Sequence, residues 1–243
     1  MTCGMVLASG YGSRLRGYVD IPKYFVDIFG RPLIEYVLYS MCRSGVDDLY
    51  VVVNELTRRY LVSSGLIEKY GVDVIVNPRP ELENGYTLLY SLSVVDDVSV
   101  LVSVADHIYP PSILRSLVDV DGDIVIAGDP DPLYIDIGEA TKIRALGERV
   151  LEVGKGLDVF SHIDMGVFHI DRDKILSITR PLFDKFEGFT ISEVINWVVA
   201  GGGEVLVKSF SGFPWRDIDV PRDIEYVFND DFRIRVSRVF GWV

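Results

Sequence analysis

Short apolar runs of strand length alternate with helix-spaced apolar residues through the first half of the chain, and this alternation restricts the fold more than any other feature. The strand-like runs are rich in β-branched residues and cover residues 5–9, 49–53, 72–76 and 98–105. Apolar residues recur at helical spacing between them, in residues 33–41, 57–70 and 85–95. A β-α-β-α order of this kind predicts a mostly parallel sheet with helices on both faces.

The second half of the chain has a more mixed pattern. Strands are predicted at residues 123–127, 141–144, 150–153, 163–170 and 205–208. Helices are predicted after Asp171, after Thr190, where a capping box with Glu193 begins, and at residues 221–228, where a proline occupies the first turn. The fold class expected from both halves is therefore α/β, with a Rossmann-like, mixed but mostly parallel central sheet.

Length and composition favour one domain with a short extension. The chain has 243 residues, which suits one large α/β domain, and 49% are apolar, which sets intrinsic disorder aside. We expect this domain at residues 1–228. Residues 229–243 are amphipathic and end in an apolar cluster. This extension could either cover an edge of the core or form a subunit contact in a homodimer.

Charge, cysteines and the N-terminus exclude several classes of protein. The formal net charge is −12, opposite to that of proteins that bind nucleic-acid phosphates, so no nucleic-acid partner is expected. Cys3 and Cys42 are interpreted as small buried hydrophobes, neither disulfide-bonded nor metal-binding. No signal peptide and no membrane-spanning run of about 18 apolar residues is evident. A cytoplasmic protein that is not embedded in a membrane is the expectation.

The strongest chemical signal is the glycine-rich turn that follows the first predicted strand. Residues 7–15 carry Gly10, Gly12 and Arg14, and Lys23 follows closely. Glycines let the backbone approach a polyphosphate so that its N–H groups bind oxygens, and the two cations neutralise phosphate charge. The turn is neither a dinucleotide fingerprint nor a P-loop, because position 15 is not glycine and no lysine-serine pair follows. Taken alone, a purely structural turn is the alternative.

Carboxylates placed at the ends of extended segments predict a magnesium site. Asp106 directly follows the strand at residues 98–105, and ligands gather at the carboxyl ends of parallel strands. Asp217 and Asp219 are two residues apart in an extended segment, so their side chains point the same way. Either could complete the site with Asp106, since Mg²⁺ prefers carboxylate oxygens together with substrate phosphates. The alternative for Asp106 is a capping aspartate at the turn that follows the strand.

The order of these motifs resembles the sugar-phosphate nucleotidyltransferase superfamily. The glycine turn, Arg14, Lys23, residues 30–34 and the strand-end Asp106 occur in the order that this superfamily shows. Four further segments resemble the cytidylyltransferases that act on inositol 1-phosphate; they are residues 83–88, 106–109, 135–143 and 163–168. Residues 135–143 are the most distinctive of these, and the similarity runs from about residue 5 to residue 227.

The resemblance implies a reaction, a cofactor and a set of site residues. The protein would transfer CMP from CTP to inositol 1-phosphate, with Mg²⁺ as cofactor, giving CDP-inositol and pyrophosphate. The nucleotide would be held by Leu7, Ala8, Gly10, Gly12, Arg14, Lys23, Asn84 and Gly85. The metal would be held by Asp106 and Asp219, with Asp217 as second choice. The acceptor would be contacted by Glu139, Thr141, Lys142, Asp164 and the phosphate-binding Lys155.

Two further features bear on the acceptor. Its ring carries hydroxyls and no charge, so carboxylates should recognise it, and Asp136, Glu139 and Asp164 are the candidates. Met165 stands where the family often has threonine. Many relatives are fused to a membrane-bound transferase, and here the CDP-inositol would pass to a separate membrane transferase.

This reaction needs no general base, because the second pKa of a phosphate monoester is about 6 and the acceptor is already ionised at neutral pH. Catalysis would be electrostatic, with Mg²⁺ and two or three cations bringing two anions together. The three histidines have no hydrolase spacing. His107 is not expected to act in catalysis, since neighbours at a strand end point apart.

Three other functions stay open at this point. The same fold could serve a sugar 1-phosphate with UTP or dTTP. It could also serve as a non-catalytic nucleotide-binding regulator, although Arg14, Lys23, Asp106 and Asp219 are all present. A dehydrogenase fits worst, because the glycine fingerprint fails and no acidic residue ends the second strand.

Overall fold

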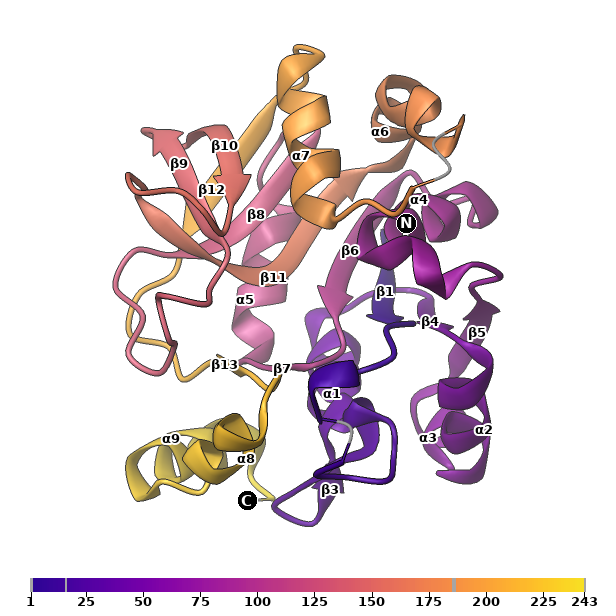
Figure 1. Cartoon of the computed structure of the whole chain (residues 1–243), viewed down its shortest axis with the longest axis vertical. Helices are drawn as coiled ribbons and strands as arrows, with labels where there is room; N and C mark the ends of the chain where they lie inside the picture. Colours follow the sequence, from indigo (N-terminus) through magenta and orange to yellow (C-terminus); the bar gives the residue numbers. More distant parts are fainter. Residues whose placement is uncertain (1, 16, 185–186, 243) are drawn as a thin grey trace.

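The computed structural model describes residues 2–15, 17–184 and 187–242, and within them nine strands form one mixed sheet (Figure 1). The strand order is β5-β4-β1-β6-β11-β8-β12-β10-β9. The strands are β1 (Thr2–Ala8), β4 (Leu49–Val53), β5 (Val72–Val76), β6 (Ser99–Val104), β8 (Ile124–Asp129), β9 (Lys142–Leu146), β10 (Arg149–Gly154), β11 (His162–Asp171) and β12 (Val205–Ser209). Two small two-stranded sheets pair β2 (Asp27–Ile28) with β3 (Arg31–Pro32), and β7 (His107–Ile108) with β13 (Arg216–Asp217).

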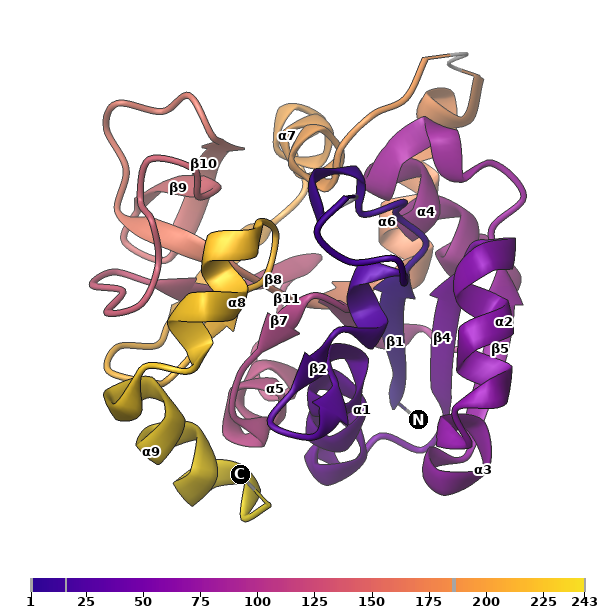
Figure 2. The ribbon, with the colours of Figure 1, turned by 60° about the horizontal axis from the view of Figure 1, so that its bottom comes forward.

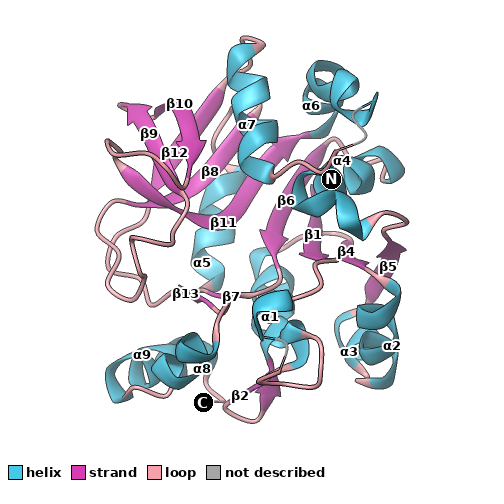
Figure 3. Ribbon diagram, viewed as in Figure 1, coloured by secondary structure: helices cyan, strands magenta, loops and turns pink. Residues whose placement is uncertain are grey.

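Helices cover both faces of the large sheet (Figure 3). They are α1 (Leu33–Ser44), α2 (Glu55–Ser63), α3 (Leu66–Tyr70), α4 (Glu83–Val94), α5 (Pro111–Val118), α6 (Arg172–Thr179) and α7 (Ile191–Ala200). Two more helices, α8 (Pro221–Val227) and α9 (Asp230–Phe240), lie away from this sheet. The helix predicted over residues 57–70 is two helices, because Gly65 adopts a left-handed φ of 72° between them. The predicted capping box at the start of α7 is confirmed, with Thr190 and Glu193 bonding each other's backbone.

The sheet is parallel in one part and antiparallel in another. Strands β5, β4, β1 and β6 are parallel, as are β8 and β12. Strand β11 runs antiparallel to both β6 and β8, and β10 runs antiparallel to β9 and β12. The prediction of a mixed sheet is confirmed, whereas its parallel part is limited to β5, β4, β1 and β6 and to the pair β8 and β12. The antiparallel pairings all involve β9, β10 or β11, which follow one another without the crossover helix that usually joins parallel strands.

Two hydrophobic cores lie on opposite faces of the sheet, and β1 contributes to both. Met5 and Leu7 pack in the core covered by α4, α6 and α7. Val6 and Ala8 pack in the core covered by α1, α2, α3 and α5. Successive side chains of a strand point to opposite faces, so burial on both sides requires the continuous apolar run that the sequence has there.

A third apolar cluster attaches the C-terminal segment to the rest of the chain. Phe232, Val236 and Phe240 of α9 are buried with side chains of α1 and of the loop before it. The Trp242 ring lies 4.2 Å from the Tyr39 ring, centroid to centroid. The apolar face of α9 therefore packs against its own chain, and the C-terminus returns toward α1 (Figure 2).

The state of the cysteines and the length of the helices can be compared with what the sequence predicts. Both cysteines are free thiols, and Cys3 is buried as predicted. Cys42 is exposed, so its predicted burial is wrong, because it lies in the last turn of α1 away from the core-facing side. No helix in the described ranges has the length and apolar content needed to cross a membrane.

Candidate active site

Two adjoining cavities lie at the carboxyl ends of β1 and β6. The smaller has a volume of about 170 Å³ and the larger about 450 Å³, and Asn84, Val104 and Asp106 line both. The smaller cavity is bounded by the glycine-rich turn after β1 and by the start of α4. The larger is bounded by β10, β11, the start of α7 and the segment around β13. Two ligands, one in each cavity, would therefore meet at Asp106.

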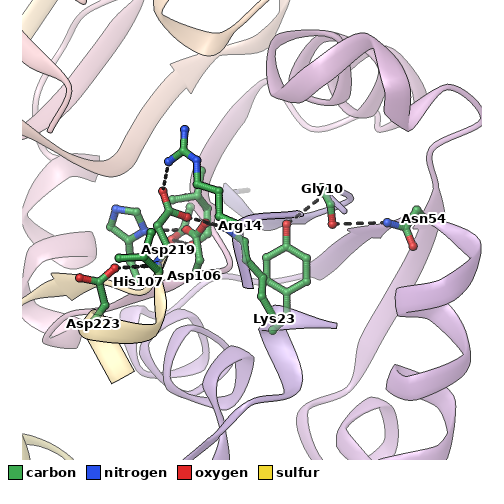
Figure 4. A network of polar contacts seen from close by, with 12 residues as sticks. Gly10, Arg14, Lys23, Asn54, Asp106, His107, Asp219 and Asp223 are labelled. Atoms are coloured by element: carbon green, nitrogen blue, oxygen red, sulfur yellow. Dashed lines mark hydrogen bonds and ion pairs between the residues drawn. The ribbon is translucent and has the colours of Figure 1, made fainter. Parts of the chain in front are cut away.

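A cluster of charges marks this meeting point (Figure 4). The ammonium of Lys23 contacts a carboxylate oxygen of Asp106 and lies 2.8 Å from Oδ1 of Asp219. A guanidinium nitrogen of Arg14 lies 3.2 Å from the other Asp219 oxygen, and the Arg14 side chain is 58% exposed. Residues that are far apart in sequence thus form one alternating arrangement of two acids and two cations.

The pKa shifts of Asp106 and Lys23 favour the charged form of both groups. Burial opposes the charged form of Asp106, but the Lys23 charge and a hydrogen bond from His107 hold the pKa of its carboxyl below the ordinary range. Burial likewise opposes the charge on Lys23, but the nearby Asp106 raises its pKa. Both groups therefore carry their charges throughout the neutral range.

His107 contacts Asp106, contrary to the expectation that these neighbours point apart. Its Nδ1 lies 2.7 Å from Oδ1 of Asp106, where Asp106 ends the turn after β6 and His107 begins β7. The imidazole stacks on Trp215 with an interplanar angle of 10°, and Trp215 Nε1 donates to Asp129 at 2.8 Å. His107 therefore orients the Asp106 carboxylate rather than facing solvent.

Asp219 is held in place by the start of α8. Oδ2 of Asp223 accepts hydrogen bonds at 2.9 Å from the backbone N–H groups of Asp219 and Val220. Its other oxygen pairs at 2.6 Å with Arg216, whose guanidinium packs over Tyr226. Sequence reasoning missed Asp223 and Arg216. An acid at the third position of a helix that opens with proline is a capping signal that would have pointed to Asp223.

The glycine-rich turn is fixed by side chains from two other segments. The N–H of Gly10 donates to the Tyr24 hydroxyl at 3.1 Å, and Asn54 donates to the Ser9 carbonyl at 2.7 Å. Gly12 has a φ of 59°, and a Cβ there would lie 3.0 Å from the Lys23 side chain. Glycine at position 12 is therefore required both by the backbone conformation and by the close approach of Lys23. Tyr24 and Asn54 were not identified from the sequence.

Most residues predicted for substrates line one of the two cavities. In the smaller cavity these are Leu7, Gly10, Gly12, Lys23, Asn84 and Asp106. In the larger cavity they are Glu139, Thr141, Lys155, Asp164, Asp217 and Asp219, together with Asn84 and Asp106. The two acids of the alternating segment, Asp217 and Asp219, thus face the same cavity as the spacing predicts. The roles assigned to all of these residues remain predictions.

Other predicted residues lie outside both cavity linings. Ala8 is buried in a core, and Arg14 reaches the site only through Asp219. Gly85 is needed for packing, since a Cβ there would lie 2.5 Å from the Phe189 carbonyl oxygen. Asp136 is exposed and pairs with Arg222 at 2.7 Å, and Lys142 donates to the Lys155 carbonyl at 3.0 Å. Lys142 thereby supports the segment that carries Lys155.

Asp164 has an unusual carboxyl in the larger cavity. Burial raises its pKa to about 6, and it accepts a hydrogen bond at 2.8 Å from the backbone of Gly166. Gly166 has a φ of 66°, and a Cβ there would lie 2.5 Å from Val104. The β11 backbone therefore bends at Gly166, which places Asp164 in the cavity lining.

This pKa predicts a pH dependence of stability. An unfolded aspartate has a pKa of about 4, so between about pH 4 and pH 6 the Asp164 carboxyl is more protonated in the folded chain than in the unfolded chain. The contribution of Asp164 to the free energy of unfolding should therefore fall as pH rises through this interval, and Asp164→Asn should remove that contribution. Denaturant unfolding of both proteins measures it. Parallel profiles for the two would show that Asp164 ionises normally.

The acids at the junction of the cavities suit magnesium bound together with a substrate. Asp106 and Asp219 offer carboxylate oxygens that share the Lys23 ammonium. Residues 2–15, 17–184 and 187–242 contain no group of three or more His, Cys, Asp or Glu side chains arranged to hold a metal ion. Mg²⁺ commonly binds one or two carboxylates and completes its octahedron with water and substrate phosphates. The two acids fit that mode.

More than half of the chain matches the model of a known protein family. Residues 4–156 match the MobA-like NTP transferase domain. The chain belongs to the MobA-like NTP transferase domain family. It is 32% identical over 247 residues to the bifunctional IPC transferase and DIPP synthase of Rubrobacter xylanophilus. The alignment covers 98% of this chain and 52% of that protein.

Solved structures match this MobA-like NTP transferase over almost its whole length. The inositol-1-phosphate CTP transferase from T. maritima superposes with a TM-score of 0.87 at 29% identity, covering 98% of this chain and 96% of that one. The CTP:phosphocholine cytidylyltransferase from Streptococcus pneumoniae has a TM-score of 0.72 at 21% identity, covering 93% and 97%, and shares the fold. The chain spans about half the length of the curated relatives it matches.

Proposed function

We propose that this MobA-like NTP transferase transfers CMP from CTP to inositol 1-phosphate in the cytoplasm, giving CDP-inositol and pyrophosphate. The observation that carries the proposal is the pair of adjoining cavities that share Asp106 beside Lys23 and Asp219. The T. maritima structure with the same fold over almost the whole chain is of a protein named for this reaction. We assign CTP to the smaller cavity and the acceptor to the larger.

The assignment of the smaller cavity to CTP rests on charge and backbone geometry. The turn at Gly10 and Gly12 lets the backbone come close to phosphates, and Lys23 supplies a fixed positive charge beside them. Arg14 is exposed next to Asp219 and is free of the core, so its guanidinium is able to follow the departing pyrophosphate. Mg²⁺ would be held by Asp106 and Asp219, and when bound it neutralises phosphate charge.

The assignment of the larger cavity to inositol 1-phosphate rests on its mixture of acids and one lysine. Lys155 would bind the acceptor phosphate, and Glu139 and Asp164 would accept hydrogen bonds from ring hydroxyls. The acceptor phosphate is already ionised near neutral pH, so it attacks the α-phosphorus without a general base, in line with the leaving pyrophosphate. The protein therefore contributes positioning and electrostatic stabilisation.

A membrane transferase would consume the CDP-inositol. The Rubrobacter relative carries a DIPP synthase activity in its name beside the IPC transferase. We propose that an activity of this kind uses the CDP-inositol that the chain produces.

Pyrophosphate release tests the proposal directly. CTP, UTP, dTTP, ATP and GTP are each combined with inositol 1-phosphate or glucose 1-phosphate in the presence of Mg²⁺. Release with CTP and inositol 1-phosphate alone is expected. Release with another pair would favour a sugar-1-phosphate nucleotidyltransferase that uses UTP or dTTP. A folded protein that binds nucleotide and releases nothing would be a regulator.

Glu139→Gln is expected to raise the KM for inositol 1-phosphate about tenfold with little change in the KM for CTP. The reason is that a ring hydroxyl would then donate its hydrogen bond to a neutral amide oxygen instead of a charged carboxylate, which is a weaker bond. Glu139 lines the larger cavity only. The matched control is Glu68→Gln, because Glu68 is exposed on α3, away from both cavities. Equal changes in both KM values would remove Glu139 from the acceptor pocket.

A further inference from the structure

Glu83 has a backbone conformation that is rare for any residue except glycine. Its φ is 65° and its ψ is −172°, at the junction between the turn Pro80–Leu82 and α4. A side chain in this region is under strain, and such a residue persists only where the surrounding structure imposes the conformation, most often at functional sites. Glu83 lines the smaller cavity.

The surroundings of Glu83 impose this conformation from both sides. The buried Leu82 accepts a hydrogen bond from the N–H of Phe189 at 3.3 Å, and Gly85 donates to the Phe189 carbonyl at 2.9 Å. The Glu83 carbonyl accepts from the Thr87 hydroxyl at 2.9 Å. A Cβ on Gly188 would lie 3.1 Å from Cγ of Glu83. The segment before α7 therefore pins the residues on either side of Glu83.

The other polar side chains of the smaller cavity already have partners. Ser9 and Thr87 both accept from Asn77, at 3.0 and 2.9 Å, and the Tyr24 hydroxyl accepts from Gly10. Lys23 and Asp106 contact each other. Two polar groups of the described lining make no hydrogen bond to the described part of the chain. They are the Glu83 carboxylate and the Asn84 amide nitrogen, whose neighbouring amide oxygen accepts from Ile191. One is an acceptor and the other is a donor.

Charge determines which part of a nucleotide these two groups meet. A carboxylate repels phosphates, so the triphosphate would lie along the part of the lining formed by Lys23 and the glycine-rich turn rather than beside Glu83. The base then faces the start of α4. Cytosine presents an amino group as donor beside two acceptors, which matches the Glu83 carboxylate and the Asn84 amide. Uracil and thymine present a carbonyl oxygen in place of the amino group.

We propose that Glu83 selects the base of the nucleotide. Its carboxylate accepts a hydrogen bond from the exocyclic amine of cytosine and repels the 4-carbonyl oxygen of uracil and thymine. The inference rests on the proposed use of CTP and adds a discriminating residue to it. The strained backbone is the consequence of placing a glutamate, rather than glycine, at this point of the cavity wall.

Nucleotide binding to variants of the full chain tests this inference. Dissociation constants for CTP and UTP are measured by calorimetry in Mg²⁺. Glu83→Gln is expected to lower the preference for CTP over UTP by at least about tenfold, because an amide donates to the uracil carbonyl as well as accepting from an amine. Glu83→Gly should also lose the preference while melting at a higher temperature, since the strain is relieved.

The control variant is Glu81→Gln. Glu81 is two residues away and exposed, it pairs with Arg79 at 3.1 Å, and it does not line the cavity. It should keep the wild-type ratio of dissociation constants. An unchanged ratio in Glu83→Gln, with wild-type protein that prefers CTP, would overturn the role of Glu83 alone. Wild-type protein without a preference for CTP would overturn this role together with the proposed nucleotide. A preference for CTP without turnover on inositol 1-phosphate would count against the reaction and leave the Glu83 result decisive.

Discussion

Lys23→Ala is expected to lower kcat by at least about 100-fold, the cost of removing one fixed group that stabilises charge in a transition state. Lys23 is the cation that contacts Asp106 and Asp219 at the junction of the two cavities. Without it, the described lining of the smaller cavity keeps no cation to offset the charge that builds on the leaving pyrophosphate, and Arg14, which pairs with Asp219 outside that lining, is the cation left nearby. Steady-state pyrophosphate release with CTP and inositol 1-phosphate measures the loss.

The same substitution should change how Mg²⁺ affects folding. Asp106 and Asp219 lose their shared ammonium, so the carboxylates repel one another and the melting temperature falls. A divalent cation is expected to restore more stability to Lys23→Ala than to wild type, because the lysine no longer competes for the two acids. Thermal melts with and without Mg²⁺, without nucleotide, measure this difference.

Lys174→Ala is the matched control for both effects. Lys174 lies in the first turn of α6. Its ammonium also lies between two aspartates, 2.8 Å from Asp123 and 3.7 Å from Asp171. It lines neither cavity. Its loss should leave kcat and the response to Mg²⁺ unchanged. Near-normal kcat in Lys23→Ala would mean that the phosphates bind elsewhere.

Local features of the site could be predicted from the sequence because they depend on neighbouring residues. The glycine turn at Gly10 and Gly12 follows a strand in one short segment, and glycine chemistry alone indicates a close backbone approach. The capping box from Thr190 to Glu193 is equally local, and it begins α7 as predicted. Asp106 is placed by the end of a single apolar strand.

The features that escaped prediction depend on contacts between distant segments. Lys23 and Asp219 are 196 positions apart, and no local pattern indicates that they share a hydrogen bond. Asp136 was assigned to the acceptor by chemistry, yet Arg222 of α8 pairs with it outside the cavity lining. A nucleotide contact at Gly85 stays a prediction, and the approach of Phe189 gives a separate reason for its lack of a side chain. Residue type alone does not distinguish a ligand contact from a packing requirement.

The direction of β11 shows the same limit at the level of the fold. Its apolar run from 163 to 170 indicates a buried strand, and it is one. Whether it runs parallel or antiparallel to β6 depends on where the chain re-enters the sheet, which the hydrophobic pattern does not record. This direction matters for function, because it places Asp164 and Gly166 beside the end of β6 and so beside Asp106.

Asp106→Asn is expected to abolish Mg²⁺-dependent turnover while the chain stays folded. Asparagine has the same shape, but it lacks the charge that attracts a divalent cation. Loss of a residue that hydrogen-bonds a metal ligand typically lowers metal affinity or activity by about 10–100-fold, so loss of the ligand itself should lower them more. The shape-conserving change separates charge from packing, since Asp106 is also held by His107 at 2.7 Å.

A titration of pyrophosphate release against Mg²⁺ concentration measures this prediction. Wild type should saturate, and Asp106→Asn should stay near background at every concentration. Asp73→Asn serves as control, because Asp73 is exposed on β5 and lines neither cavity. If Asp106→Asn kept the wild-type Mg²⁺ dependence, the metal would be held by the substrate phosphates with Asp219 and Asp217 instead. The charge on Asp106 would then serve mainly to position Lys23, and the two roles of this carboxylate would be separated.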